Sequence, residues 1–163
     1  MSYYCIKHPA IMYEKLEIKP GIGLSSLLFG ATMAQAELVF GKPEEIQLID
    51  DIEEFKTTVW HYWEEGFTLF FDEQNKQLFH CVEIDNPETI LWDKKLFELK
   101  EKQIIALFKA NNIELYEIEQ HDWGEKRLSF DQAHIDFYFE RNKLVSINFC
   151  KPIIDSELLI LKN

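Results

Sequence analysis

The sequence has few cysteines, and their spacing indicates neither a metal site nor a disulfide framework. Among 163 residues there are three, Cys5, Cys81 and Cys150, far apart and without a CxxC pair. An odd, widely spaced set argues against a zinc ribbon and against the disulfides of a small secreted domain. We therefore expect free thiols, most of them packed as small hydrophobic side chains.

Long apolar runs and a leader sequence are also missing. No apolar run approaches the roughly 20 residues of a membrane helix. The first residues, MSYYCIKHPAIMYEKLEIKPG, lack a basic segment followed by an apolar run and a small-residue cleavage site. These features predict a soluble, cytoplasmic protein without a membrane partner.

Basic residues are scarce relative to acidic ones. The chain has 17 Lys and Arg against 29 Asp and Glu, which gives a net charge of −12. Binding to phosphates requires a basic surface, so this balance argues against nucleic acid as a partner. It fits a basic protein partner, or simply a soluble surface.

Catalytic and metal-binding motifs are absent as well. The five histidines form no HxxxH or HExxH element, and KPGIGLSS lacks the GK[ST] end of a phosphate loop. Asp50 and Asp51 do not stand out as a catalytic couple in so acidic a chain. His80 and Cys81 are neighbours, so in a regular strand they would point to opposite faces. We predict no enzyme, no cofactor and no metal.

Apolar material, in contrast, is abundant, and it has helical periodicity near residue 36. The hydrophobic share is 47%, with 13 Phe and 4 Trp. In TMAQ, Thr32 and Gln35 have the spacing of a capping box, and Gly41 followed by Pro43 ends the helix. The apolar residues of this helix fall on one face: Ala36, Val39 and Phe40.

A shift of 68 residues repeats this pattern later in the chain. The apolar helical positions recur at Ile104, Leu107 and Phe108. Period-two apolar positions, which are typical of strands, also recur at this shift. These are Trp60 and Tyr62 with Leu128 and Phe130, then Phe67, Leu69 and Phe71 with Ile135, Phe137 and Phe139.

The repeat predicts an α+β fold with two tandem helix plus three-stranded antiparallel meander repeats packed as one body. The first repeat would cover residues 1–86 and the second 87–163, with a boundary near DNPET. Between helix and meander lie two inserts, EEIQLIDDIEEF and IELYEIEQHDWG. The first belongs to a run of six acids and no base from Glu44 to Glu54, which we interpret as a solvated loop or edge.

The stretch GIGLSSLLFGATMAQAELVFGKP, followed by a meander and repeated once, resembles the β-lactamase-inhibitor-protein-like and outer-membrane-assembly-lipoprotein-like superfamily. The similarity is strongest from Gly30 to Pro43, and the second copy lacks the Gly and Pro. The resemblance implies a sheet that presents an open face to a protein partner. Small bacterial proteins of this kind also resemble immunity proteins that neutralise toxins.

Strand alternation predicts which residues occupy the outer face of the sheet. In the first repeat they are His61, Trp63, Thr68 and Phe70, with His80 and Val82. In the second they are Arg127, Ser129, Asp136, Tyr138, Ser146 and Asn148. The aromatic first half needs a cover, because an antiparallel sheet normally leaves a polar face in water. Candidate covers are the N-terminal strand, the tail at Leu158–Leu161, a homodimer partner, a foreign protein or a small ligand.

The sequence therefore predicts a non-enzymatic interaction protein, an inhibitor or immunity protein that binds a basic partner. The predicted binding residues are His61, Trp63, Phe70, His80 and Tyr138 on the sheet face, and Asp50, Asp51, Glu53 and Glu54 in the acidic loop. The alternative is a small-ligand-binding or catalytic domain with a pocket between the repeats. A broad aromatic face favours the first function, and a polar cluster in a deep cavity favours the second.

Overall fold

The structure, a computed structural model, describes residues 15–52, 55–72 and 76–152. The described residues form 13 strands, two α-helices and one 3₁₀ helix. In chain order these are β1 (Ile18–Lys19), β2 (Gly23–Leu24), β3 (Leu27–Leu28), α1 (Met33–Phe40), β4 (Glu45–Ile52), β5 (Phe55–Tyr62), β6 (Phe67–Asp72), β7 (Leu78–Ile84), β8 (Ile90–Leu91), β9 (Lys94–Lys95), η2 (Leu96–Glu98), α2 (Glu101–Ala110), β10 (Glu117–Gln120), β11 (Glu125–Phe130), β12 (Ile135–Glu140) and β13 (Lys143–Cys150).

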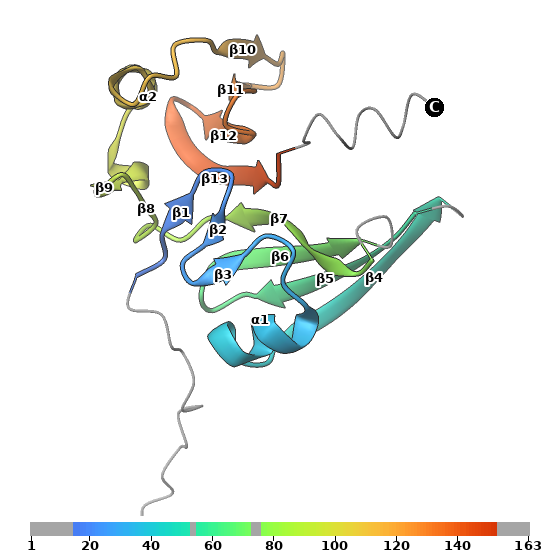
Figure 1. Cartoon of the computed structure of the whole chain (residues 1–163). Helices are drawn as coiled ribbons and strands as arrows, with labels where there is room; N and C mark the ends of the chain where they lie inside the picture. The colour runs from blue at the N-terminus through green and yellow to red at the C-terminus, as the bar shows by residue number, and fades with distance from the viewer. Residues whose placement is uncertain (1–14, 53–54, 73–75, 153–163) are drawn as a thin grey trace, which may run out of the picture.

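One eight-stranded antiparallel sheet dominates the fold (Figure 1). Its strand order is β10-β11-β12-β13-β7-β6-β5-β4. Strands β4 to β7 form one meander and strands β10 to β13 form another, and the two meet where β13 pairs with β7. That pairing places Ile147 opposite Ile84 and Phe149 opposite Val82, so the buried side chains of both halves lie in direct register.

The predicted fold class is wrong. The protein is mostly β and is built on a single large sheet, rather than on two α+β repeats with three-stranded meanders. Each half supplies four strands, because the two segments that we interpreted as inserts contain the edge strands β4 and β10. An edge strand forms ladder hydrogen bonds on one side only and tolerates many charges, so the acidic run of β4 resembled a loop in the sequence.

The first predicted helix is confirmed as α1. Thr32 Oγ1 accepts a hydrogen bond from Gln35 N at 3.1 Å, and Gln35 Oε1 accepts one from Thr32 N at 2.8 Å. The predicted capping box is therefore present. Gly41 ends the helix with a φ of 78°, which only glycine adopts without strain.

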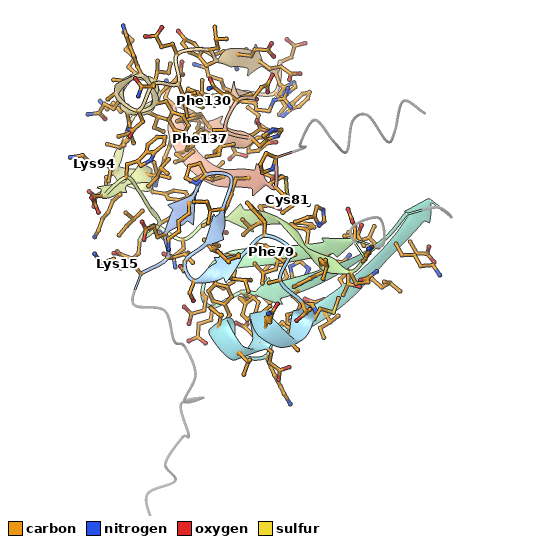
Figure 2. All side chains as sticks on the ribbon, viewed as in Figure 1. Lys15, Phe79, Cys81, Lys94, Phe130 and Phe137 are labelled. Atoms are coloured by element: carbon orange, nitrogen blue, oxygen red, sulfur yellow. A yellow bond between two sulfur atoms is a disulfide. The ribbon has the colours of Figure 1, made fainter. Side chains whose placement is uncertain are left out.

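A single core lies between the sheet and the elements that cover one of its faces. Figure 1 shows α1 beside the β4–β7 half and α2 beside the β10–β13 half. The buried cluster includes Phe40 of α1 and Phe108 of α2, and also Leu24 of β2. Phe108 stacks on Phe130 with ring centroids 3.8 Å apart. In Figure 2, Phe130 lies in the upper half of the molecule and Phe79 in the lower half, so aromatic side chains fill the core of both halves.

The expectation of free thiols is wrong for two of the three cysteines. Cys81 of β7 and Cys150 of β13 form a disulfide. The two residues are 69 positions apart, but the register makes them direct neighbours across the β7–β13 pair. The sequence spacing gave no indication of this pairing, because it depends on how the two meanders join. Cys5 lies outside the described residues.

Gly23 provides a test of the hairpin packing over the core. A Cβ atom at this position would lie 2.0 Å from the carbonyl oxygen of Leu27. Gly23→Ala should therefore lower the free energy of unfolding by about 3 kcal/mol through overpacking. The control is Gly124→Ala, where nothing lies within 4 Å and the cost of a positive φ, about 1 kcal/mol, remains. Equal losses for both variants in urea unfolding would contradict the steric argument.

Candidate functional site

A row of polar side chains crosses all eight strands of the sheet. Cross-strand pairing links its members directly. The row has one residue in each strand. The six residues in β5, β6, β7, β11, β12 and β13 have a core residue on both sides along their own strand, as His61 has Trp60 and Tyr62. Side chains alternate along a strand, so the row lies on the face opposite the core, here called the outer face. The members of this polar row, from β4 to β10, are Glu45, His61, Thr68, Glu83, Asn148, Asp136, Ser129 and Glu117.

The polar row is acidic. Four of the eight residues in the row are carboxylates, and none is Lys or Arg. In the adjacent register line through Tyr138, Arg127 lies opposite Glu119 on β10, and Nη2 of Arg127 is 2.6 Å from Oε2 of Glu119. The guanidinium of Arg127 is therefore already paired with a carboxylate. Burial, together with the carboxylate of Asp136, raises the pKa of the Tyr138 phenol, so Tyr138 is protonated at neutral pH.

His61 and Trp63 form a stacked aromatic pair at the end of β5. Their rings stack with centroids 4.2 Å apart and an interplanar angle of 7°. The two ring nitrogens of His61 lie 3.1 Å from Thr68 Oγ1 and 3.1 Å from Gln47 Oε1. The indole Nε1 of Trp63 donates a hydrogen bond to Oε2 of Glu45 at 3.0 Å. Trp63 nevertheless remains 58% exposed, so a large side chain is held in place and still faces water.

A pocket of about 250 Å³ opens beside this pair. Its walls include Trp63 and His61 of the β4–β7 half and Ser146 of β13. Glu83 and Asp85 also line it, and both are exposed. Tyr62 lies beneath the rim, and its phenol donates a hydrogen bond to the carbonyl of Gly41 at 2.8 Å, which fastens the end of β5 to the end of α1. The pocket therefore combines an aromatic wall with two carboxylates.

The structure brings together only some of the predicted binding residues. His61 and Trp63 share the pocket, whereas Phe70, His80 and Tyr138 do not line it. Phe70 is half-buried and lies between Val59 and Cys81 in the register. The outer face thus carries a polar row beside the His61–Trp63 pair, with Phe70 and Tyr138 in the register lines on either side of the row, rather than a broad aromatic surface.

The predicted acidic loop is not a loop where the structure describes it. Asp50 and Asp51 belong to the edge strand β4, and Asp50 is exposed. Glu53 and Glu54 lie outside the described residues. Asp50 therefore adds charge along one border of the sheet.

A β-bulge explains why Glu83 was missed and Val82 was misplaced. The register shifts between Phe70 and Phe71, opposite His80, so His80 is an extra residue in β7. Counting by twos across it placed Val82 on the outer face, but Val82 is fully buried and Glu83 faces outward. A bulge is a tertiary feature with no clear sequence signal here. Alternation counted backwards from Ile84 alone would have placed Glu83 correctly.

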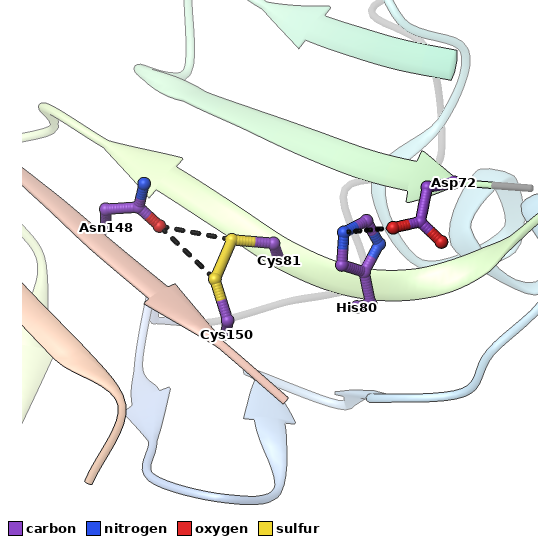
Figure 3. Close-up of a disulfide and its surroundings, with 5 residues drawn as sticks. All are labelled: Asp72, His80, Cys81, Asn148 and Cys150. Atoms are coloured by element: carbon purple, nitrogen blue, oxygen red, sulfur yellow. Dashed lines mark hydrogen bonds and ion pairs between the residues drawn. A yellow bond between two sulfur atoms is a disulfide. The ribbon is translucent and has the colours of Figure 1, made fainter. Parts of the chain in front are cut away.

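His80 lies at this bulge and pairs with a carboxylate rather than with a cysteine. Its Nε2 is 3.1 Å from Oδ2 of Asp72, and Figure 3 shows the ring turned toward Asp72. Burial lowers the pKa of His80 in spite of Asp72, and Nδ1 is buried without an aligned hydrogen-bond partner. The geometry of Figure 3 therefore does not arrange His80 as a base for Cys81.

A second stacked His–Trp pair lies in the turn between β10 and β11. His121 and Trp123 have centroids 4.3 Å apart with an interplanar angle of 7°. Nε1 of Trp123 donates to Oε2 of Glu125 at 3.0 Å, and Trp123 is 73% exposed. Neither residue lines the pocket. The short patterns HYW and HDW in the sequence mark both pairs, and sequence reasoning did not use them.

Comparisons with known proteins add no functional information. The chain matches no protein-family model, and it has no significant match among curated proteins or solved structures. Within residues 15–52, 55–72 and 76–152, no helix has the length and apolar character needed to cross a membrane. The same part of the chain contains no group of three or more His, Cys, Asp or Glu side chains arranged to hold a metal ion.

The lowered pKa of His80 predicts a pH dependence of stability. The unfolded chain, with a histidine pKa near 6.5, binds this proton more tightly than the folded protein does. The contribution of His80 is therefore complete above the unfolded pKa and is lost as the pH falls below it. Thermal unfolding at pH 7 and pH 5 should show a larger loss for the wild type than for His80→Gln. An NMR titration that places the pKa of His80 above 6.5 would refute the burial argument.

Proposed function

We propose that this protein is a non-enzymatic, cytoplasmic protein-binding module of the inhibitor or immunity type. Its outer face would take a basic segment of a partner protein. The polar row is the observation that carries the proposal, because it spans the whole sheet with four carboxylates and no Lys or Arg. A surface of this sign attracts a basic partner and disfavours an acidic one.

The aromatic pair supplies the anchor that a charged surface alone lacks. Trp63 is exposed, and its orientation is already fixed by His61 and Glu45. An ordered side chain loses little conformational entropy when it is buried by a partner. Tryptophans of this kind are frequent among the residues that dominate interface energetics. The resemblance to inhibitor proteins supports the same proposal by analogy.

The pocket suggests which part of the partner binds there. A Lys or Arg side chain of the partner would meet the carboxylates of Glu83 and Asp85 and pass along the edge of Trp63. Charged hydrogen bonds and cation–π contact are the interactions that these groups offer. A volume of 250 Å³ is below the usual range for drug-sized ligands, which begins at about 300 Å³.

A small cationic ligand is the second candidate, because the pocket is lined from both meanders. Calorimetry with free arginine and with spermidine tests it directly. Binding of such a ligand that is lost in Glu83→Gln, combined with no binding of basic peptides or proteins, would favour this candidate over a protein partner.

The anchor is tested by a matched pair of tryptophan variants. Trp63→Ala should weaken the binding of basic peptides, or of a purified basic partner, by about thirtyfold, equivalent to about 2 kcal/mol. Trp123→Ala removes another exposed indole, 73% exposed against 58% for Trp63, with similar stacking and a similar hydrogen bond to a glutamate. It lies away from the pocket, so this variant should bind normally. Melting temperatures of both variants should stay close to that of the wild type. Equal affinities for both variants would exclude Trp63 as the anchor.

Charge steering is tested by reversing acids inside and outside the outer face. Glu83→Lys with Asp85→Lys should slow association with a basic partner by about tenfold at low salt, and should also speed dissociation, because the same carboxylates contact the partner's Lys or Arg. The control, Glu98→Lys with Glu114→Lys, makes the same charge change at exposed positions away from the pocket. Stopped-flow kinetics at low and high salt measures both rates. An association rate of the wild-type protein that does not depend on salt would rule out steering.

A further inference from the structure

The disulfide crosses the junction on which the eight-stranded sheet depends. β7 and β13 are the two strands through which the meanders pair, and Cys81 and Cys150 are direct partners in that ladder. Figure 3 shows the bond lying between these two strands, with Asn148 beside it. A bond at this place connects the two halves covalently, in addition to the backbone hydrogen bonds of a single strand pair.

The two sulfurs differ in their access to solvent. Cys81 is buried with 8% of its surface exposed, whereas Cys150 is only half-buried, close to the end of β13. A thiolate from solution must approach a disulfide sulfur directly to exchange with it. Cys150 is therefore the sulfur that is attacked, and Cys81 is the leaving group.

The surroundings accommodate both oxidation states. Oδ1 of Asn148 lies 3.1 Å from Sγ of Cys81 and 3.5 Å from Sγ of Cys150. The disulfide has no proton to donate to this oxygen, but after reduction either thiol can donate a hydrogen bond to it. Lys151 follows Cys150, its backbone N donates to His80 O at 2.6 Å, and its charge contributes to the lowered pKa of His80.

We propose that Cys81 and Cys150 form a reversible thiol–disulfide exchange site for a small-molecule thiol such as glutathione. The proposal stands on the β7–β13 geometry and is independent of the binding function. In the cytoplasm, the compartment proposed above, a disulfide is typically transient or redox-sensing rather than permanent, so this step rests on that proposed location. The site would report the thiol balance around the protein and tighten or loosen the junction accordingly.

The exchange proceeds in two balanced steps. The thiolate of the small thiol attacks Sγ of Cys150, a new S–S bond forms, and Cys81 leaves as a thiolate that takes a proton from water. A second small thiolate then attacks the sulfur of the bound small thiol, which releases Cys150 as a thiolate and yields the small-molecule disulfide. Two electrons pass from the two small thiols to the protein disulfide, and the reverse sequence restores it.

The test uses the full-length chain carrying Cys5→Ser, which leaves only the two cysteines of the site. The folded protein is equilibrated in buffers of reduced and oxidised glutathione over a wide range of ratios, alkylated, and measured by intact mass. We expect the disulfide fraction to follow the ratio and to be the same from either direction. A protein that stays fully oxidised or fully reduced across the whole range would overturn the proposal.

The stability of the two forms gives a second readout on the same samples. The oxidised form should melt roughly 5 to 15 °C higher than the reduced form, because the bond closes a long loop. The circular dichroism of the reduced form should remain that of a folded protein. A reduced protein that is unfolded at 25 °C would make the disulfide a purely structural bond and would reject reversible exchange in the folded state.

The roles of the individual residues are tested by variants. Cys81→Ser should form a mixed disulfide with glutathione at Cys150 much faster than Cys150→Ser does at Cys81. Asn148→Asp should slow exchange about tenfold, because a carboxylate beside the sulfurs raises the thiol pKa. Asn142→Asp makes the same change in the β12–β13 turn, at the other end of β13, and should leave the rate unchanged. Equal rates for the two cysteines, or for the two aspartates, would contradict the assigned roles.

Discussion

The pairing of β13 with β7 is the interaction on which the rest of the structure depends. Without this pairing the chain would contain two separate four-stranded meanders. β7 and β13 would then be edge strands, and the apolar faces of the two meanders would not be continuous. With it, Ile147 lies against Ile84 and Phe149 against Val82, so the two apolar faces form one core. The same register carries the polar row across the junction, from Glu83 to Asn148. The register of this one strand pair therefore aligns both the core residues and the polar row.

The burial of one face determines the composition of the other. Strand side chains alternate, so the apolar residues under α1 and α2 leave the intervening positions on the opposite face of the sheet. In this chain eight of those positions form a polar row across the full width of the sheet, and four of the eight are carboxylates. A surface of this charge disfavours association with a second copy of the chain and favours contact with basic molecules.

The aromatic pair, the pocket and the disulfide all lie along the outer face, but they depend on different local features. Trp63 is held by stacking on His61 and by a hydrogen bond to Glu45 on the edge strand β4, and not by the core. Glu83 reaches the pocket because the bulge at His80 resets the alternation of β7. Cys81, two residues before Glu83, connects the same strand to β13. A change in the β7–β13 pairing would therefore shift the pocket residues that these strands carry, such as Glu83 and Ser146.

Local patterns in the sequence determined the local elements of this protein. The capping residues Thr32 and Gln35 located α1, and apolar alternation located strands such as β6 and β12, because helix caps and period-two burial act over a few residues. Only the tertiary structure determined which strands pair with each other. It turned the acidic segment at Glu45–Ile52 into an edge strand, inserted His80 as a bulge and brought Cys81 opposite Cys150. These outcomes depend on pairing between strands that are distant in the sequence. That pairing is selected by the burial of apolar side chains in the complete core, so no short stretch of sequence encodes it.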